Sequence, residues 1–419
     1  MKYNGLEGLS DYGEMRSTTP LFSAFATPVP EELKALYGNE PYKYIAEAIK
    51  QTRCFNALWR KTQIQLDTSL DETGYAHPKY NRRIHTEVVE RDAVELAEAL
   101  GLNVELTQVI ALAHDVGHVA GGHKGEQTLK KIVSDISDGK HDFSHPNQAV
   151  INLQAETLNL SSDMEVGIIN HTNDEFVDKS RKAEGVFTEI MTHKSKTCPE
   201  GILVQIADNI SSTLHDIDDL MQMGVLTKEK ALNNAEFKNS LARFDVTIDE
   251  LFNATDEILS KMRKGVIECI IGNTKVIDGR LSISLGEMTQ ALYALRAANY
   301  KFFDDPVIAA QNEIIEKNVQ TICDYYIEHE NELDANLRKI LTASSDHISL
   351  SEERKQYGLK KVDAFMMQPF EVKLTTFYTM HNDIEINTMV HAIEMQKKNI
   401  REKLDTIHNE THNNNPLST

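Results

Sequence analysis

The chain has 419 residues, 41% of them hydrophobic, and a formal net charge of −20 at pH 7. That charge argues against broad, nonspecific binding to nucleic acid, which depends on neutralising phosphates with Lys and Arg. No apolar run reaches membrane-spanning length and the N-terminus has no signal-peptide pattern, so we expect no membrane association. Four scattered cysteines without a CxxC pair indicate reduced thiols and predict a cytoplasmic protein.

The spacing of apolar residues predicts helices along most of the chain. The helical pattern starts near residue 31, after an irregular arm, and a polar loop at 67–80 interrupts it. The expected helical segments are 31–36, 42–66, 85–100, 104–114, 125 onward, 146–158, 163–171, 183–193, 199–222, 226–265, 286–334 (two long helices separated by residues 304–306), 360–380 and 383–404. The composition of 266–284 leaves room for one small strand pair, and the Asn- and His-rich tail predicts disorder.

We therefore expect an all-α fold with room for one small β-hairpin. The expected parts are an N-terminal arm (1–30), a core (31–225), a helical region packed on that core (226–404) and a disordered tail (405–419).

Four residues of metal-ligand type occur in apolar helical settings: His85, His114, Asp115 and Asp208. Adjacent helical residues point about 100° apart, but at a helix end that opens into glycine, as after Asp115, both can reach one ion. Asp208 follows an apolar run, where an unpartnered carboxylate would be costly to bury. A single His at a helix end is usually capped or solvated, yet the joint pattern favours a divalent ion with open positions for water and phosphate oxygen.

A second group of residues has the composition of an acid–base site. His118, His123 and Glu126 follow the His114–Asp115 pair within about a dozen residues. His123 and Glu126 are three apart, so one helical turn would bring them together. A carboxylate that orients an imidazole provides a general acid or base near neutral pH. The alternative is a tight glycine turn with exposed histidines.

Polar residues also continue from Asp208 along one helix face, at the positions Ser212, His215, Asp216 and Asp219. Such a stripe is usually solvated surface, but next to a predicted ligand we expect it to line a pocket. An acidic protein that binds an anion must concentrate positive charge at the site. Basic residues precede the first predicted ligand: Arg53, Arg60, Lys61, Arg82 and Arg83.

The sequences RRIHTEV at 82–88 and GHVAGGHKGE at 117–126, with the His–Asp pair and Asp208, resemble the HD-domain deoxynucleoside triphosphate triphosphohydrolases, of which dGTPase is the best-known type. The resemblance covers about residues 50–385 and includes KTQI at 61–64. It implies an HD-domain helical fold with additional C-terminal helices. It also implies one ion (Mn²⁺, Mg²⁺, Fe²⁺, Co²⁺, Ni²⁺ or Zn²⁺) on His85, His114, Asp115 and Asp208.

The resemblance assigns roles to further residues. His123 and Glu126 would activate or position the nucleophile, while His118 and His145 would lie beside the phosphates and the leaving oxygen. Asp216 would hold the sugar 3′-hydroxyl. The residues implied to bind substrate are Arg82, Lys61, Gln63, Asp216 and Ser212.

The implied activity is hydrolysis of a dNTP, with dGTP favoured, to a deoxynucleoside and inorganic triphosphate by a homo-oligomer (tetramer or hexamer). The sequence departs from the family at Ser212, where a tyrosine is usual, and at Asn56-Ala57, where an arginine pair is frequent. Three alternatives stay open: an HD nucleotidase or phosphodiesterase, a dNTP-sensing regulatory protein with little turnover, and a scaffold that retains a metal.

Overall fold

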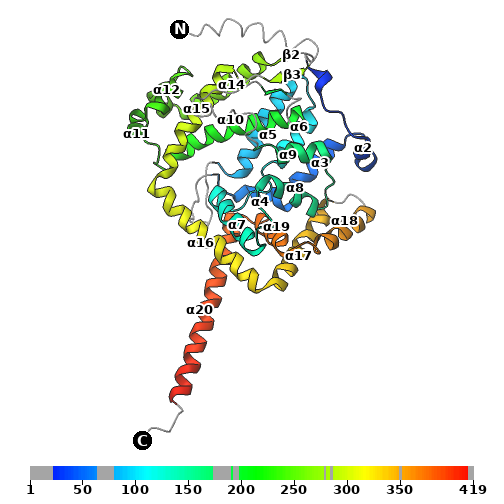
Figure 1. The fold of residues 1–419 in the computed structure, drawn as a ribbon, viewed down its shortest axis with the longest axis vertical. Helices are drawn as coiled ribbons and strands as arrows, with labels where there is room; N and C mark the ends of the chain where they lie inside the picture. Colours follow the sequence, from blue (N-terminus) through cyan, green and yellow to red (C-terminus); the bar gives the residue numbers. More distant parts are fainter. Residues whose placement is uncertain are drawn as a thin grey trace.

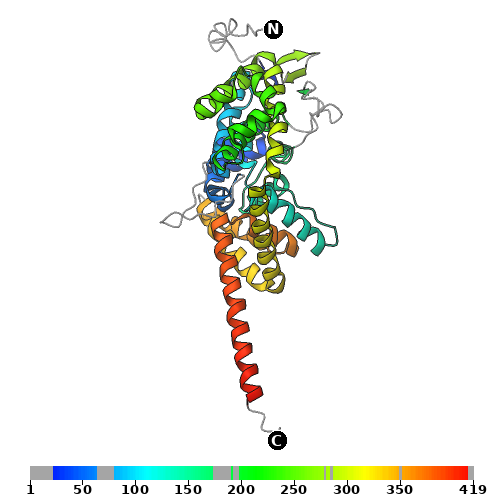
Figure 2. The same ribbon diagram turned by 90° about the vertical axis from the view of Figure 1, so that its left-hand side faces the viewer.

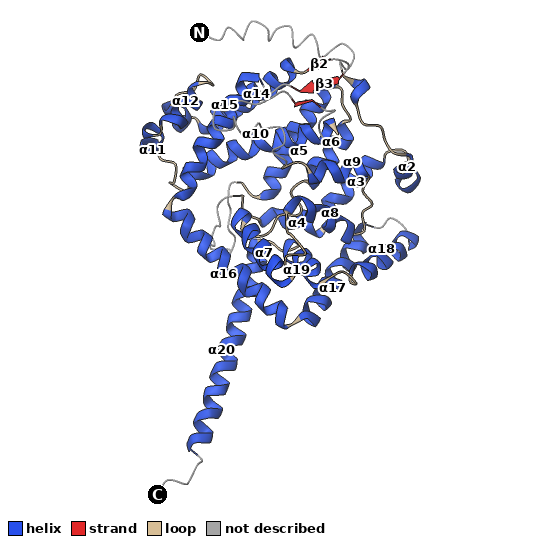
Figure 3. Cartoon of the chain, viewed as in Figure 1, coloured by secondary structure: helices blue, strands red, loops and turns tan. Residues whose placement is uncertain are grey.

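The computed structural model describes residues 22–63, 80–172, 190–191, 198–277, 280–283, 286–348 and 352–413, and the expected all-α class is confirmed (Figure 3). The helices of the N-terminal half are α2 (Glu31–Tyr37), α3 (Pro41–Gln51), α4 (Arg53–Ala57), α5 (Arg82–Leu100), α6 (Val104–Ala113), α7 (Gly122–Ile136), α8 (His145–Ala155), α9 (Ser162–Ile169) and α10 (Pro199–Gln222). Short 3-10 turns occupy Ser23–Phe25 and Leu58–Arg60. Within the described part of the chain, no helix is long and apolar enough to cross a membrane.

The C-terminal half continues the helical pattern. Its helices are α11 (Lys228–Asn233), α12 (Ala235–Ala242), α13 (Ile248–Asn253), α14 (Thr255–Asn273), α15 (Gly286–Asn299), α16 (Pro306–Glu328), α17 (Glu330–Ile348), α18 (Glu352–Phe365), α19 (Phe370–Thr379) and α20 (Asp383–Asn413). A 3-10 turn at Tyr300–Asp304 separates α15 from α16, close to the break expected before Pro306.

A small antiparallel sheet of strand order β1-β3-β2 packs beside α14. Its strands are β1 (Ile190–Met191), β2 (Lys275–Ile277) and β3 (Arg280–Ile283), with Ile190 opposite Ile283 and Val276 opposite Leu281. The expected strand pair is present within 266–284 as β2 and β3, whereas 266–271 belongs to α14. Val266, Ile267 and Ile270 are buried there at helical spacing. β1 also replaces the end of the helix expected at 183–193, whose residues 183–189 lie outside the described residues.

Two further helix boundaries differ from expectation. The helix expected over 42–66 breaks at Thr52, which has an extended backbone and whose side chain accepts a hydrogen bond from the amide of Phe55, the cap of α4. The disordered tail expected from residue 405 was wrong up to Asn413, because α20 continues to that residue. No glycine or proline interrupts the sequence between Asp383 and Asn413, and Pro416 follows. Residues 414–419 lie outside the described residues.

Two apolar clusters form the core, and α5 and α10 contribute to both. The first cluster joins α3, α6 and α8 to the C-terminal helices α16, α17, α19 and α20. The second joins α10 to α12, α14 and α15. Helices α5, α6 and α10 therefore lie at the centre of the molecule. The last turns of α20 project away from the body of the molecule (Figure 1), and they are also separate from it in the view rotated by 90° (Figure 2). The expected boundary near residue 225, between the core and the C-terminal helical region, remains a prediction.

Gly117, just after the His114–Asp115 pair, sets how closely α8 approaches this pair. A Cβ at Gly117 would lie 2.0 Å from the carbonyl oxygen of His145 and 2.4 Å from the amide nitrogen of Ala149. Both contacts are with backbone, so no side-chain rotation can relieve them. A glycine is therefore required for the start of α8 to pack against the turn after α6.

Gly117→Ala should destabilise the protein by about 3 kcal/mol or more, because the added methyl group must displace backbone. Gly272→Ala is the matched control, since a Cβ there meets no atom within 4 Å in α14. It should stabilise the helix by about 0.5–1 kcal/mol. Denaturant unfolding of both variants checks this expectation, and equal stabilities would contradict the packing described here.

Candidate active site

Three packed helices bring the four predicted metal ligands together. His85 lies in the first turn of α5, His114 and Asp115 follow the end of α6, and Asp208 lies in α10. The His85 Nε2 atom lies 3.0 Å from Asp208 Oδ1 and 3.8 Å from Asp115 Oδ2. The His114 Nε2 atom lies 3.6 Å from Asp115 Oδ1. The ligand atoms of His85, His114 and Asp115 therefore lie close enough together to hold one ion, and Asp208 joins this group through its contact with His85.

The chemistry of His114 fits a metal ligand. Its Nδ1 atom lies 2.6 Å from the carbonyl oxygen of Ala111 and must carry the proton, because a carbonyl only accepts. Its Nε2 atom therefore presents a lone pair. That atom is buried and has no hydrogen-bond partner among the described residues. A buried imidazole whose far nitrogen is fixed by a backbone carbonyl is a common arrangement of metal-binding histidines.

The carboxylates of the cluster are held in their charged form. Although burial acts to raise it, the neighbouring His114 ring and the Arg82 guanidinium hold the pKa of Asp115 well below its usual range. The Arg82 Nη1 atom donates to Asp115 Oδ2 at 3.1 Å. Burial acts to raise the pKa of Asp208, but the hydrogen bond to His85 and the electrostatic effect of the neighbouring histidines together lower it. Ionised carboxylates and neutral imidazoles are the forms that bind divalent ions.

A second group, formed by Asp115, His118 and His145, also has ligand atoms close enough to hold an ion. In this group, however, His118 Nε2 already contacts Asp115 Oδ1 at 3.2 Å. The His118 ring also stacks on the His145 ring, with a centroid distance of 3.8 Å. The group of His85 and His114 fits an ion better because the His114 nitrogen is unpaired.

The acid–base pair differs from the expected one. The Glu126 carboxylate accepts from the backbone amide of His145 at 3.0 Å and contacts its Nδ1 at 3.0 Å. No hydrogen bond or ion pair between His123 and Glu126 is found among the described residues, and His123 is exposed, its ring centroid 6.0 Å from that of His118. In this structure Glu126 pairs with His145 instead of His123. The free amide at the start of α8 attracts the Glu126 carboxylate away from its own helix.

His171, which the sequence analysis did not select, completes this group of histidines. Its Nδ1 atom donates to the carbonyl oxygen of Ile168 at 2.6 Å, and its Nε2 atom lies 3.3 Å from His145 Nε2. Burial lowers the pKa of His171 to about 3, so the ring is neutral near pH 7. A lone histidine after an apolar helix carries no motif, so only the fold reveals its place beside His114 and His145.

Polar groups without partners border the metal cluster. The Nε and Nη2 atoms of Arg82 are buried and unpaired among the described residues, as is Gln63 Oε1. Asp216 is buried on the same helix as Asp208, and this burial raises its pKa to about 7. Ser212, also on α10, is partly buried, and its hydroxyl lies 3.4 Å from the carbonyl oxygen of Asn209. These groups form the side of the site on which an anion and a sugar could bind.

Two further residues border this side and were not selected as contacts from the sequence. Tyr80 stacks on His215 with a centroid distance of 4.0 Å, and the His215 Nδ1 atom lies 3.3 Å from His85 Nδ1. Arg296, in α15, hydrogen-bonds Asn209, and its positive charge opposes the rise in the pKa of Asp216.

Lys61 lies in the core instead of presenting a free cation. Its ammonium donates to the carbonyl oxygens of His118, at 2.6 Å, and Thr379. Burial lowers the pKa of Lys61 to about 8. Asp383, at the start of α20, accepts from the backbone amides of Thr62 and Gly121 at 2.7 Å each. The turn between α19 and α20 therefore holds the loop after Asp115. Because the Lys61 ammonium is already bound to two carbonyl oxygens, we do not propose that it contacts phosphate.

Comparisons with known proteins agree with this arrangement. A model of the HD domain matches residues 82–213, a range that contains all four predicted ligands. The chain is 25% identical over 316 residues to the deoxyguanosinetriphosphate triphosphohydrolase-like protein of Desulfatibacillum aliphaticivorans, covering 73% of this chain and 79% of the relative. The protein of the same description from Clostridium tetani is 26% identical over 300 residues, covering 70% and 75%. That from Caldanaerobacter subterraneus is 32% identical over 189 residues, covering 44% and 46%.

Residues 82–213 therefore form an HD domain. Over about 70% of its length the chain is similar to dGTPase-like proteins, and the resemblance stated from the sequence is confirmed.

Removing one ligand tests the metal cluster. Asp115→Ala should lose most of the bound Mn²⁺ measured by elemental analysis after loading and desalting, while helical content by circular dichroism stays close to that of the wild type. Asp216→Asn, a matched change of a buried aspartate without a contact to the four ligands, should keep its metal. Full metal content in both Asp115→Ala and Asp208→Ala would rule out this cluster as the metal site.

Lys61→Met tests the structural role of Lys61. The change leaves two buried carbonyl oxygens without a donor, which should cost about 2–4 kcal/mol of unfolding free energy. Lys124→Met, which removes only a partly exposed ion pair with Glu316, should cost less than about 1 kcal/mol. A Lys61→Met protein of wild-type stability in denaturant unfolding would show instead that the ammonium has another task.

Proposed function

We propose that the protein hydrolyses deoxynucleoside triphosphates to a deoxynucleoside and inorganic triphosphate, with dGTP the favoured substrate. The observation that carries the proposal is that an unpartnered metal-ligand atom lies close to unpartnered donors for an anion. The His114 nitrogen faces Asp115 without a partner, and two buried nitrogens of Arg82, whose third contacts Asp115, are also unpaired. Buried donors and lone pairs without partners are rare unless a ligand satisfies them.

The names of the relatives support a triphosphate substrate over other phosphate esters. Arg82 would bind phosphate oxygens through its two free nitrogens, and guanidinium groups bind phosphate well. A divalent ion bound by the four ligands would neutralise phosphate charge and lower the pKa of a water that attacks the α-phosphorus. The bond to the nucleoside 5′-oxygen breaks, and triphosphate leaves the sugar.

The departing 5′-oxygen needs a proton, and the geometry favours His145 as its source. The Glu126 carboxylate orients the His145 ring, which stacks on His118 beside Asp115. His171 contacts the other ring nitrogen, so an exchange of the proton between two imidazoles is possible at 3.3 Å. His123, exposed at the start of α7, would act on the solvent side, by positioning the nucleophile or a phosphate oxygen.

The product distinguishes this function from its alternatives. Each dNTP is incubated separately with Mn²⁺-loaded protein, and the phosphate product is identified by ion chromatography. Inorganic triphosphate with the free deoxynucleoside is the expected result. Monophosphate, or hydrolysis of nucleoside monophosphates and cyclic nucleotides only, would indicate a nucleotidase or phosphodiesterase. Tight dNTP binding without turnover would instead favour a dNTP-sensing protein.

Glu126→Gln should lower the turnover number by about 10²–10⁴-fold, because the amide cannot stabilise a protonated His145. Metal content should stay at the wild-type level. Glu316→Gln, a change of an exposed carboxylate next to α7, is the control and should keep full activity. A decrease of less than about tenfold in Glu126→Gln would exclude the Glu126–His145 pair from the chemistry.

Asp216 is proposed to accept a hydrogen bond from the sugar 3′-hydroxyl. A buried group that loses its partner costs free energy, so the wild type should discriminate against ddGTP relative to dGTP by about 10²-fold or more in kcat/KM. Asp216→Ala should remove most of this difference. If the wild type hydrolyses dGTP and ddGTP equally well, Asp216 does not recognise the sugar.

A further inference from the structure

A pair of imidazoles joins α5 to α10 beside the metal cluster. The Nδ1 atom of His85 lies 3.3 Å from the Nδ1 atom of His215, and the two rings meet edge to face at 75°. Both side chains are buried, and no other partner of the His85 Nδ1 atom is found among the described residues. The second nitrogen of His85, Nε2, faces Asp208 and Asp115. One edge of the His85 ring therefore belongs to the metal cluster and the other edge to His215.

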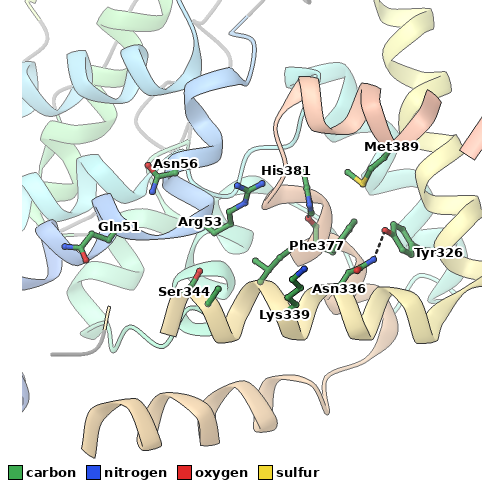
Figure 4. A pocket seen from close by; sticks show the side chains of 12 residues that line it. Gln51, Arg53, Asn56, Tyr326, Asn336, Lys339, Ser344, Phe377, His381 and Met389 are labelled. Carbon is green, nitrogen blue, oxygen red and sulfur yellow. Dashed lines mark hydrogen bonds between the residues drawn. The ribbon is translucent and has the colours of Figure 1, made fainter. Parts of the chain in front are cut away.

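Histidines at helix ends find a different partner for Nδ1. In the described part of the chain, four histidines that follow the end of a helix place Nδ1 at 2.6 or 2.7 Å from a backbone carbonyl oxygen three or four residues earlier: His114, His171, His329 and His381. The last carbonyls of a helix have no helical donor, so they are available to such a ring. His381 is an example that lies beside Phe377 in a cavity away from the metal cluster (Figure 4).

His85 and His215 have no such carbonyl within reach of their own helices. His215 lies inside α10, where the carbonyls accept from helical amides, and the carbonyl of Asn81, just before α5, accepts from the amide of His85. Each imidazole must therefore find a partner on another helix. Two N–H groups cannot face each other, so one Nδ1 atom of the pair is the donor and the other is the acceptor.

Metal binding decides which of the two histidines donates. For His85 to bind an ion through Nε2, that nitrogen must present a lone pair, so the ring proton lies on Nδ1. His215 must then accept at its own Nδ1 atom and carry its proton on Nε2. A carbonyl always accepts, whereas an imidazole nitrogen accepts in only one of the two neutral tautomers. The orientation of His85 thus depends on His215 in a way that the orientation of His114, which uses a carbonyl, does not.

Tyr80 holds the ring of His215. The two rings stack with a centroid distance of 4.0 Å and an interplanar angle of 17°. Tyr80 lies two residues before the start of α5, so the stack connects this end of α5 to α10. A ring nitrogen accepts in the plane of its ring, and a stack that fixes this plane also fixes the direction of the lone pair.

We propose that His215 is a positioning residue of the metal site, which accepts the Nδ1 proton of His85 and so fixes the ring of this ligand for binding a divalent ion. Tyr80 supports the arrangement by fixing the plane of the His215 ring. The inference rests on the metal site of the proposed function. It goes beyond that function because neither residue is itself a ligand.

Titration of the full-length protein with Mn²⁺, followed by the electron paramagnetic resonance signal of the free ion, measures metal affinity without any substrate. His215→Phe keeps a ring against Tyr80 and removes the acceptor, so it should bind Mn²⁺ about 10–100-fold more weakly. His215→Asn places a carbonyl oxygen near the position of Nδ1 and should restore most of the affinity. Equal affinities of His215→Phe and the wild type would overturn the proposal. An Asn variant as weak as the Phe variant would also overturn it, because shape and not the acceptor would then matter.

Two further comparisons separate the hydrogen bond from general effects of a ring substitution. His329 stacks on Tyr325 with a centroid distance of 4.2 Å outside the site, so His329→Phe should bind Mn²⁺ as the wild type does. Tyr80→Ala should weaken binding several-fold, whereas Tyr80→Phe should not. Equal affinities of Tyr80→Ala and Tyr80→Phe would overturn the role of the stack. Circular dichroism of each metal-free variant checks that the helical content is that of the wild type.

The titrations distinguish this inference from the proposed function. If the wild type binds Mn²⁺ and hydrolyses no dNTP, the proposed function fails and the comparison of the His215 variants still decides the role of His215. If the wild type hydrolyses dNTPs and His215→Phe binds Mn²⁺ as tightly, only the role of His215 fails. A wild type that binds no Mn²⁺ would overturn the metal site and this role together.

Discussion

Two buried acidic side chains, Asp115 and Asp208, constrain the centre of the molecule. A carboxylate removed from water is stable only when charge and hydrogen bonds compensate it. Arg82 and His118 provide this for Asp115, and His85 provides it for Asp208. Because these partners come from α5 and from the turn after α6, the helices must pack closely where an ion would bind. The apolar clusters on either side of α5 and α10 hold that arrangement.

The C-terminal helices complete the site from a distance in sequence. Asp383 and the Thr379 carbonyl fix Gly121, Thr62 and Lys61. The loop that carries His118 and His123 is thus held by residues more than 250 positions later in the chain. This explains why the HD-domain match, which ends at residue 213, does not cover all the residues that form the site.

The sequence predicted well what depends on local spacing. The all-α class and most helices follow from helical periodicity, whereas the ligand set of His85, His114, Asp115 and Asp208 is what the family resemblance implies. Contacts between segments far apart in the sequence were harder to predict. The pairing of Glu126 with His145 depends on a free amide at the start of another helix, and the place of His171 depends on how α9 packs. The burial of Lys61 depends on α19. None of these three features can be recognised from the periodicity or the composition of the sequence.

The position of the ion tests the account most directly. Crystals grown with Mn²⁺ and a non-hydrolysable dGTP analogue, measured at the manganese absorption edge, would locate it by anomalous scattering. The account predicts one peak bounded by His85, His114, Asp115 and Asp208, with phosphate oxygens within hydrogen-bond distance of Arg82. A peak between Asp115, His118 and His145 instead, or no peak at either group, would contradict it.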